Sequence, residues 1–149
     1  MRYAAQSMIL AMLATGGAAS VSADNRSGDL VITKECSQYT GAAGAFCTIT
    51  SSNLPQIKAG SKVYYDQAAG IPEGLVDSNA VLDAGNGNWA MGRCTINGNT
   101  KTAVGLCTFS DGTGTLSGFS ARVVVYSTDS AGINYRWQGT YSFSPIGFH

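Results

Sequence analysis

The chain reads C-T-F-S-D-G-T-G-T-L-S-G-F-S-A-R-V-V-V-Y-S from residue 107 to 127, and N-Y-R-W-Q-G-T-Y-S-F from 134 to 143. Glycines at positions 112, 114 and 118 interrupt a strand-like pattern in the first segment. Glycine in such a pattern indicates a bulge or the close approach of another backbone. The two segments therefore predict a sheet that bends sharply and wraps round on itself.

The last segment alternates cleanly between two faces. One face carries mainly aromatic side chains, and these positions are Tyr135, Trp137, Gly139, Tyr141 and Phe143. Residues 121–126 are apolar on both faces except at Arg122. Because successive strand residues point to opposite faces, this strand should be covered on both sides, one of which is the inside of a barrel.

Strand-like runs recur along the whole chain between turn signals rich in glycine. They are 29–35, 45–51, 61–67, 75–82, 88–94, 103–109, 115–127 and 134–143. Many short strands at near-regular spacing are typical of a barrel or a sandwich. We expect an all-β fold, a single antiparallel eight-stranded barrel.

The N-terminal 23 residues look like a secretory signal. Arg2 precedes an apolar run over 4–14, and Val21-Ser22-Ala23 has the small-residue form of a cleavage site. The alternative, a transmembrane anchor, is disfavoured because the run is short and is interrupted by Gly16-Gly17. We expect residues 24–149 to form one domain that is secreted or periplasmic, with no membrane span.

The charge balance excludes some partners. The formal net charge is 0 for the whole chain, and it becomes −1 after residue 23 because Arg2 is removed. No basic surface is available for a phosphate backbone, so nucleic acid is not expected as a partner. The formation of homo-oligomers through a covered sheet face is an alternative that the sequence leaves open.

Four cysteines follow the signal, which argues for two disulfides in an exported chain. Three pairings exist. We favour Cys36–Cys47 and Cys94–Cys107, because each pair brackets a turn-like segment. The only histidine is His149 and no C-x-x-C is present, so neither a metal site nor a cofactor is expected.

Asn97-Gly98 invites a two-residue hairpin, which conflicts with the second bridge. That hairpin would place Cys94 opposite Lys101, six residues from Cys107. Six strand residues span about 20 Å, whereas a disulfide tolerates roughly 7 Å between Cα atoms. We keep the bridge and expect a longer loop over residues 96–102.

Three local patterns together resemble the allene oxide cyclase-like barrel superfamily, which includes dirigent proteins. They are G-R-C at 92–94 with G-L-C-T-F at 105–109, D-G-T-G-T-L-S-G-F at 111–119, and W-x-G-T-Y at 137–141. The resemblance covers about residues 92–143. It implies an eight-stranded barrel with an apolar lumen that steers cyclisation or coupling by orienting its substrate. A family cyclase uses a glutamate near the first strand, where this chain has Glu35.

Candidates for acid–base chemistry are few. Glu35 and Asp66 are the candidate catalytic carboxylates, and the alternative for each is a solvated group at the rim or outer face. His149 ends the chain, so a nucleophile–histidine scheme has no base.

Candidate ligand-binding residues are aromatic, with one arginine. They are Tyr64, Arg122, Tyr126, Tyr135, Trp137 and Tyr141. The aromatic residues suit a flat hydrophobic ligand, and their alternative is ordinary core filling. Arg122 would anchor an anionic group if it points inward, or lie along the outer face if it does not.

The sequence thus predicts a secreted barrel that binds a small apolar or aromatic molecule in its lumen. Two alternatives stay open. One is a cofactor-free isomerase or cyclase, or a dirigent-like coupling guide, with the same lumen. The other is an interaction module whose filled barrel only presents its surface.

Overall fold

The computed structural model describes residues 26–70, 74–98 and 103–145. The expected signal at 1–23 and His149 lie outside these residues. Within them are eight strands and one short 3-10 helix, η1 (Gly114–Leu116). The strands are β1 (Ser27–Glu35), β2 (Phe46–Ser52), β3 (Lys62–Tyr65), β4 (Leu75–Asp83), β5 (Trp89–Asn97), β6 (Val104–Ser110), β7 (Phe119–Ser127) and β8 (Asn134–Phe143). The described part contains no helix with the length and apolar character needed to cross a membrane.

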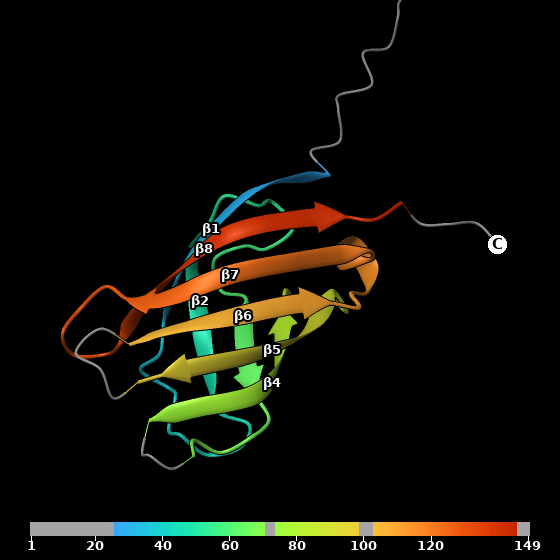
Figure 1. The fold of residues 1–149 in the computed structure, drawn as a ribbon. Helices are drawn as coiled ribbons and strands as arrows, with labels where there is room; N and C mark the ends of the chain where they lie inside the picture. Colours follow the sequence, from blue (N-terminus) through green and yellow to red (C-terminus); the bar gives the residue numbers. More distant parts are fainter. Residues whose placement is uncertain (1–25, 71–73, 99–102, 146–149) are drawn as a thin grey trace, which may run out of the picture.

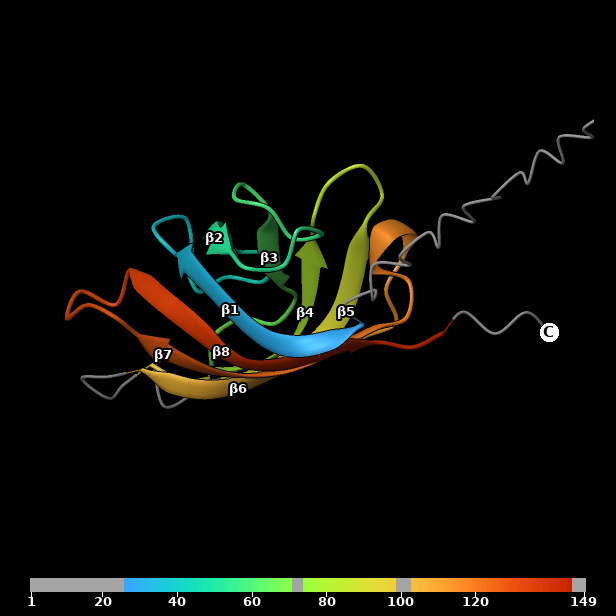
Figure 2. The same cartoon turned by 90° about the horizontal axis from the view of Figure 1, so that it is seen from above.

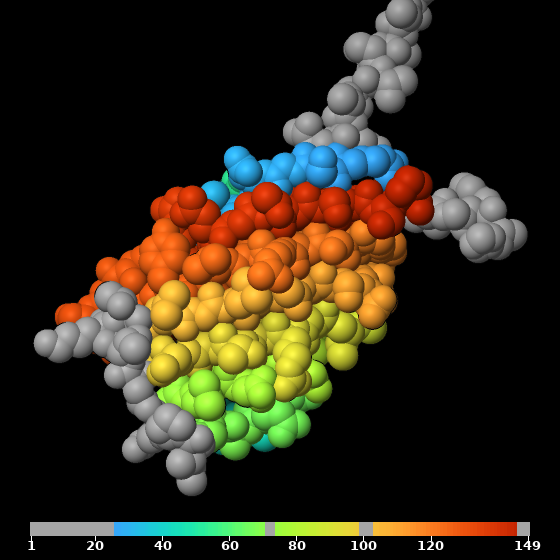
Figure 3. Space-filling model, viewed as in Figure 1, coloured from blue at the N-terminus to red at the C-terminus, as the bar shows by residue number. Residues whose placement is uncertain are grey.

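The strands close into one antiparallel barrel, as the sequence predicts. Each strand pairs with the next along the chain, and β8 pairs with β1 over nine residue pairs from Ser27–Ser142 to Glu35–Asn134. Figure 1 shows β4 to β8 and β1 side by side, and Figure 2 shows β2 and β3 on the opposite wall. In the space-filling view the strands form neighbouring bands, with β1 against β8 (Figure 3).

The glycine-rich segment before β7 is the main correction to the predicted strands. Residues 115–118 form part of η1 and the turn after it, and β7 begins only at Phe119. Gly114 and Gly118 have φ angles of 57° and 76°, a region that side-chain-bearing residues rarely adopt. These glycines therefore serve a tight connection, and the strand curvature arises elsewhere.

The expected close approach of two backbones occurs at Gly139, in the middle of β8. A Cβ atom there would collide with the carbonyl oxygen of Arg122 on β7. The two backbones can approach this closely only because no side chain stands between them.

Both predicted disulfides are present. Cys94 and Cys107 lie directly opposite each other on β5 and β6, with Cα atoms 4.2 Å apart. In the same register Asn97 pairs with Val104, which rules out the tight hairpin. The connection is shorter than we expected, because residues 96 and 97 still belong to β5. Cys36 and Cys47 link the end of β1 to β2.

The two ends of the barrel are filled differently. At the end where η1 lies, the β2–β3 connection inserts Leu54 and Ile57, and η1 inserts Leu116. Phe119 packs there against Phe143, with ring centroids 5.4 Å apart. We call this end the plugged end. The opposite end, formed by the β1–β2, β3–β4, β5–β6 and β7–β8 connections, leads to the cavity described next.

Candidate functional site

The candidate site is built around Lys34 on β1. Leu30 and Ile32 face the core, and alternation places Lys34 on the same inward face two residues later. Only 2% of its surface is exposed, although lysine is almost never fully buried without a partner. A buried lysine inside a small barrel therefore requires an explanation.

Aromatic rings surround the Lys34 amine. Its Nζ donates a hydrogen bond of 2.5 Å to Tyr65 Oη on β3. The same nitrogen lies 4.9 Å from the Trp137 ring centroid, 5.2 Å from that of Tyr65 and 5.6 Å from that of Tyr135. Rings at these distances attract a cation through their faces, so the cage partly compensates a charge.

The cage contains no counter-ion. Among the described residues, no aspartate or glutamate is buried, and Lys34 makes no ion pair. Desolvation lowers the pKa of Lys34 from 10.5 to about 7. Burial also raises the pKa values of Tyr39, Tyr65 and Tyr135, so these phenols stay neutral. The amine therefore loses much of its charge near neutral pH.

A cavity of about 300 Å³ lies between Lys34 and the loops at this end of the barrel. Tyr39, Tyr65 and Tyr135 form its aromatic walls, and the Cys36–Cys47 bridge lies beside them. Its remaining lining is mostly small or aliphatic, namely Ala69, Gly74, Val76, Ile96, Gly98, Ala131 and Gly132. The volume is at the lower limit of about 300–1,000 Å³ for small-molecule sites.

Hydrogen bonds fix one loop of the cavity. Asp129 accepts hydrogen bonds from the backbone N–H groups of Ile133 and Asn134, each 3.0 Å long. These bonds lower the pKa of the Asp129 carboxyl. They hold the β7–β8 turn, which supplies Ala131 and Gly132 to the lining.

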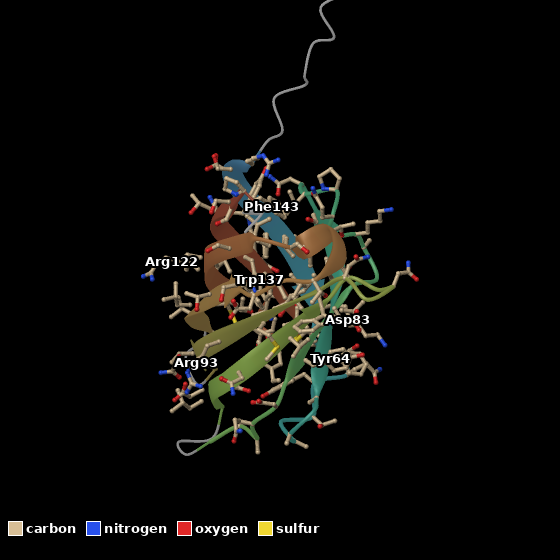
Figure 4. All side chains as sticks on the ribbon, turned by 90° about the vertical axis from the view of Figure 1, so that its right-hand side faces the viewer. Tyr64, Asp83, Arg93, Arg122, Trp137 and Phe143 are labelled. Carbon is tan, nitrogen blue, oxygen red and sulfur yellow. A yellow bond between two sulfur atoms is a disulfide. The ribbon has the colours of Figure 1, made fainter. Side chains whose placement is uncertain are left out.

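Three predicted ligand-binding residues do face the interior. Tyr135 lines the cavity, and the buried Trp137 is not part of the lining but has its ring centroid 4.9 Å from Lys34 Nζ. Figure 4 shows Trp137 in the middle of the ring of strands. Tyr141 also faces inward, but it packs against Phe143 at the plugged end.

The other three predicted ligand-binding residues do not face the lumen. Tyr64 alternates with buried Val63 and Tyr65 and packs against Phe46 on the outer face. The Tyr126 hydroxyl donates a hydrogen bond to the side-chain oxygen of the exposed Gln138. Arg122 is exposed and extends away from the barrel (Figure 4). The outward alternative for Arg122 is therefore the observed one.

Both candidate carboxylates also lie outside the barrel. The exposed Asp66 accepts hydrogen bonds from Ser78 Oγ and Asn79 Nδ2 just after β3. Glu35 accepts one from the Ser37 N–H, and hydrogen bonding to Ser37 lowers its pKa. Neither is positioned to move a proton inside the lumen, which corrects the expectation that they would serve there.

Sequence reasoning missed Lys34, Tyr39 and Tyr65. A signal existed for Lys34, since it continues the inward alternation of Leu30 and Ile32. The same alternation from Val63 would have selected Tyr65 in place of Tyr64. Tyr39 lies in a loop, where no periodicity applies.

A larger hollow of about 970 Å³ lies on the outer wall and includes Arg93 and Arg122. It is open to solvent, and Arg93 is already paired with Asp77 at 2.6 Å. Because an apolar molecule would stay hydrated there, we take the smaller interior cavity as the candidate site.

Metal binding and known relatives give no further guide. The described residues include no group of three or more potential metal ligands. No family model, curated protein or solved structure matches this chain. The candidate function must therefore be argued from the cavity itself.

Proposed function

We propose that this protein is an exported binding barrel for a small aromatic or apolar molecule that carries one polar end. The apolar part would occupy the loop-end cavity against Tyr39 and Tyr135, and the polar end would meet Lys34. The observation that carries the proposal is a buried lysine without a carboxylate partner at the inner end of an aromatic cavity. Such a group is costly for folding alone, so a binding role explains its presence.

The cavity offers few polar groups, and they converge. The Lys34 amine and the Tyr65 hydroxyl lie together, as their hydrogen bond shows. The Tyr39 hydroxyl is buried and has no hydrogen-bond partner within the described residues. A mostly apolar wall with a small number of convergent polar groups is typical of small-molecule sites.

Export is part of the proposal. Two disulfides support an oxidising compartment. The residue pattern at 1–23 supports it independently. Homo-oligomer formation stays a prediction.

The resemblance to allene oxide cyclase-like barrels also stays a prediction. The closed eight-stranded barrel is compatible with it. A cyclase or coupling guide is the weaker candidate, because neither Glu35 nor Asp66 reaches the lumen and no described carboxylate is buried. Orientation alone remains as the means of such catalysis.

Binding can be measured with N-phenyl-1-naphthylamine, a neutral aromatic probe that fluoresces in apolar surroundings. The wild-type protein should bind it and raise its emission. Val76→Phe should weaken binding by at least about tenfold, because Val76 lines the cavity and a ring would fill it. Absence of binding to the wild type would favour the filled-barrel module.

A matched control separates the cavity from the surface. Val124→Phe makes the same substitution on the outer face, where Val124 is 47% exposed. It should leave probe affinity unchanged. Equal weakening by both variants would show that the probe reports general loosening of the fold, and the proposal would fail.

A further inference from the structure

We infer that Lys34 is a reversible covalent site for small aromatic aldehydes, which condense with its amine to form an imine inside the barrel. This inference rests on the proposed function, because the aldehyde must first occupy the same cavity. Lysines that act in this way are desolvated in hydrophobic pockets, and Lys34 is 2% exposed among aromatic rings. The amine also lines the cavity, so an occupant can reach it.

The structure favours an aldehyde over a carboxylic acid. A bound carboxylate has two oxygens that together accept several hydrogen bonds. The polar side-chain groups of the lining are the neutral hydroxyls of Tyr39, Tyr65 and Tyr135 and the Lys34 amine, whose pKa burial lowers to about 7. Burying an ion pair there would require desolvating both charges. An aldehyde brings a single neutral oxygen, which leaves the site as water.

Tyr65 is placed to transfer the protons of this reaction. The nitrogen lone pair of Lys34 attacks the carbonyl carbon, and the carbonyl π electrons move to oxygen. The Tyr65 hydroxyl, 2.5 Å from Nζ, gives its proton to that oxygen and regains one from the nitrogen. The carbinolamine hydroxyl then takes the Tyr65 proton and leaves as water while the nitrogen lone pair forms C=N, and the iminium nitrogen returns a proton to the Tyr65 oxygen. The net change is amine plus aldehyde to imine plus water, with no oxidant or reductant.

Other groups around Lys34 do not interfere. Tyr135 on β8 and Tyr39 in the β1–β2 connection are phenols with raised pKa values. After burial, the negative charge of Asp129 in the β7–β8 turn is the second cause that raises the pKa of Tyr135. Burial lowers the pKa of Lys34 to about 7, so a large share of the amine is unprotonated at neutral pH. A fully exposed lysine is almost entirely protonated there.

The test uses 2-naphthaldehyde with cyanoborohydride at pH 7. Reduction of the imine fixes the adduct, which adds the mass of the aldehyde less one oxygen atom. We expect one adduct per chain, mapped to Lys34 by peptide mass spectrometry. Lys34→Met should abolish it, whereas Lys62→Met should retain it, because Lys62 lies on β3 over the Phe46 ring and outside the cavity lining. Adducts spread equally over several lysines would overturn the inference.

Two further measurements separate the possible failures. Tyr65→Phe should slow adduct formation at saturating aldehyde by at least about tenfold, since general acid–base assistance contributes about 10²–10⁴-fold. The second measurement uses 2-naphthalenemethanol. This alcohol has the same ring system but cannot form an imine. If it displaces the naphthylamine probe and the aldehyde gives no adduct, the binding proposal stands and the covalent inference is wrong. If neither compound enters the cavity, both are wrong.

Discussion

The two ends of this barrel are built from the same strands but differ in what the connections do. At the plugged end the β2–β3 connection and η1 insert Leu54, Ile57 and Leu116 between the strands. At the other end the connections contribute small residues such as Ala131 and Gly132, and a cavity of about 300 Å³ remains. One end is therefore organised for stability, whereas the other holds a buried amine that folding alone does not favour.

The interior charge sharpens this contrast. The side chains packed at the plugged end are mainly apolar or aromatic, as Phe119 and Phe143 illustrate, and no described charged side chain is buried there. The loop end places Lys34 among the rings of Trp137, Tyr65 and Tyr135, with a hydrogen bond to the Tyr65 hydroxyl. Substitutions at the two ends should consequently have opposite signatures, with stability lost at one and binding lost at the other.

The largest expected effect is at the plugged end. Phe119→Ala removes a ring that is 1% exposed and packed against Phe143, so it should lower the free energy of unfolding by about 3–5 kcal/mol. Denaturant unfolding measures the loss. The matched variant Val124→Ala, on the outer face, should change stability by no more than about 0.5 kcal/mol. Similar losses in both would contradict the picture of a packed plug.

The next largest effects are expected from the two disulfides, which should differ in their effect on probe binding. Serine replacement of either bonded pair should cost about 3 kcal/mol, because each bridge closes a loop of 11 or 13 residues in sequence separation. Loss of the Cys36–Cys47 bridge, which lines the cavity, should also weaken binding of the naphthylamine probe. Loss of the Cys94–Cys107 bridge should leave the affinity for the probe unchanged in the fraction of the protein that stays folded. Thermal unfolding and probe titration together check both statements.

The pH dependence of the free energy of unfolding should report the protonation of the Lys34 amine. Its pKa is about 7 in the folded chain and 10.5 as a free side chain, so between these values the unfolded state binds more protons. The free energy of unfolding should therefore rise with pH above about 7, by up to about 1.4 kcal/mol per unit. Denaturant titrations from pH 6 to 9 measure this slope. Lys34→Met should remove it, and a slope that persists in the variant would exclude Lys34 as its source.

The smallest effect is expected from the carboxylates outside the barrel. Glu35→Gln and Asp66→Asn should leave probe affinity and the yield of aldehyde adduct within about twofold of the wild type, because neither side chain reaches the cavity. A loss of adduct in either variant would restore a catalytic role for that residue. Combining the two substitutions provides the stricter version of this control.

Much of the fold could be predicted because barrel strands are encoded locally. The alternation over 134–143 predicted the bounds of β8 and the inward face of Trp137. The cysteine spacing predicted both bridges, and the incompatibility of Asn97-Gly98 with one of them correctly excluded a tight hairpin. The glycine-rich run before β7 was misread as strand, since positive φ values serve a turn as well as a bulge.

The sequence by itself determined which residues alternate along each strand, and its spacing favoured the cysteine pairing and the closed barrel that the structure shows. The alternation also pointed Lys34 inward, a signal carried by Leu30 and Ile32. Only the tertiary structure decided what surrounds that amine, because Tyr65 and Trp137 reach it from β3 and β8, far away along the chain. Only the tertiary structure also decided which end is hollow, because filling depends on how loops from distant segments pack together and not on the period of any strand.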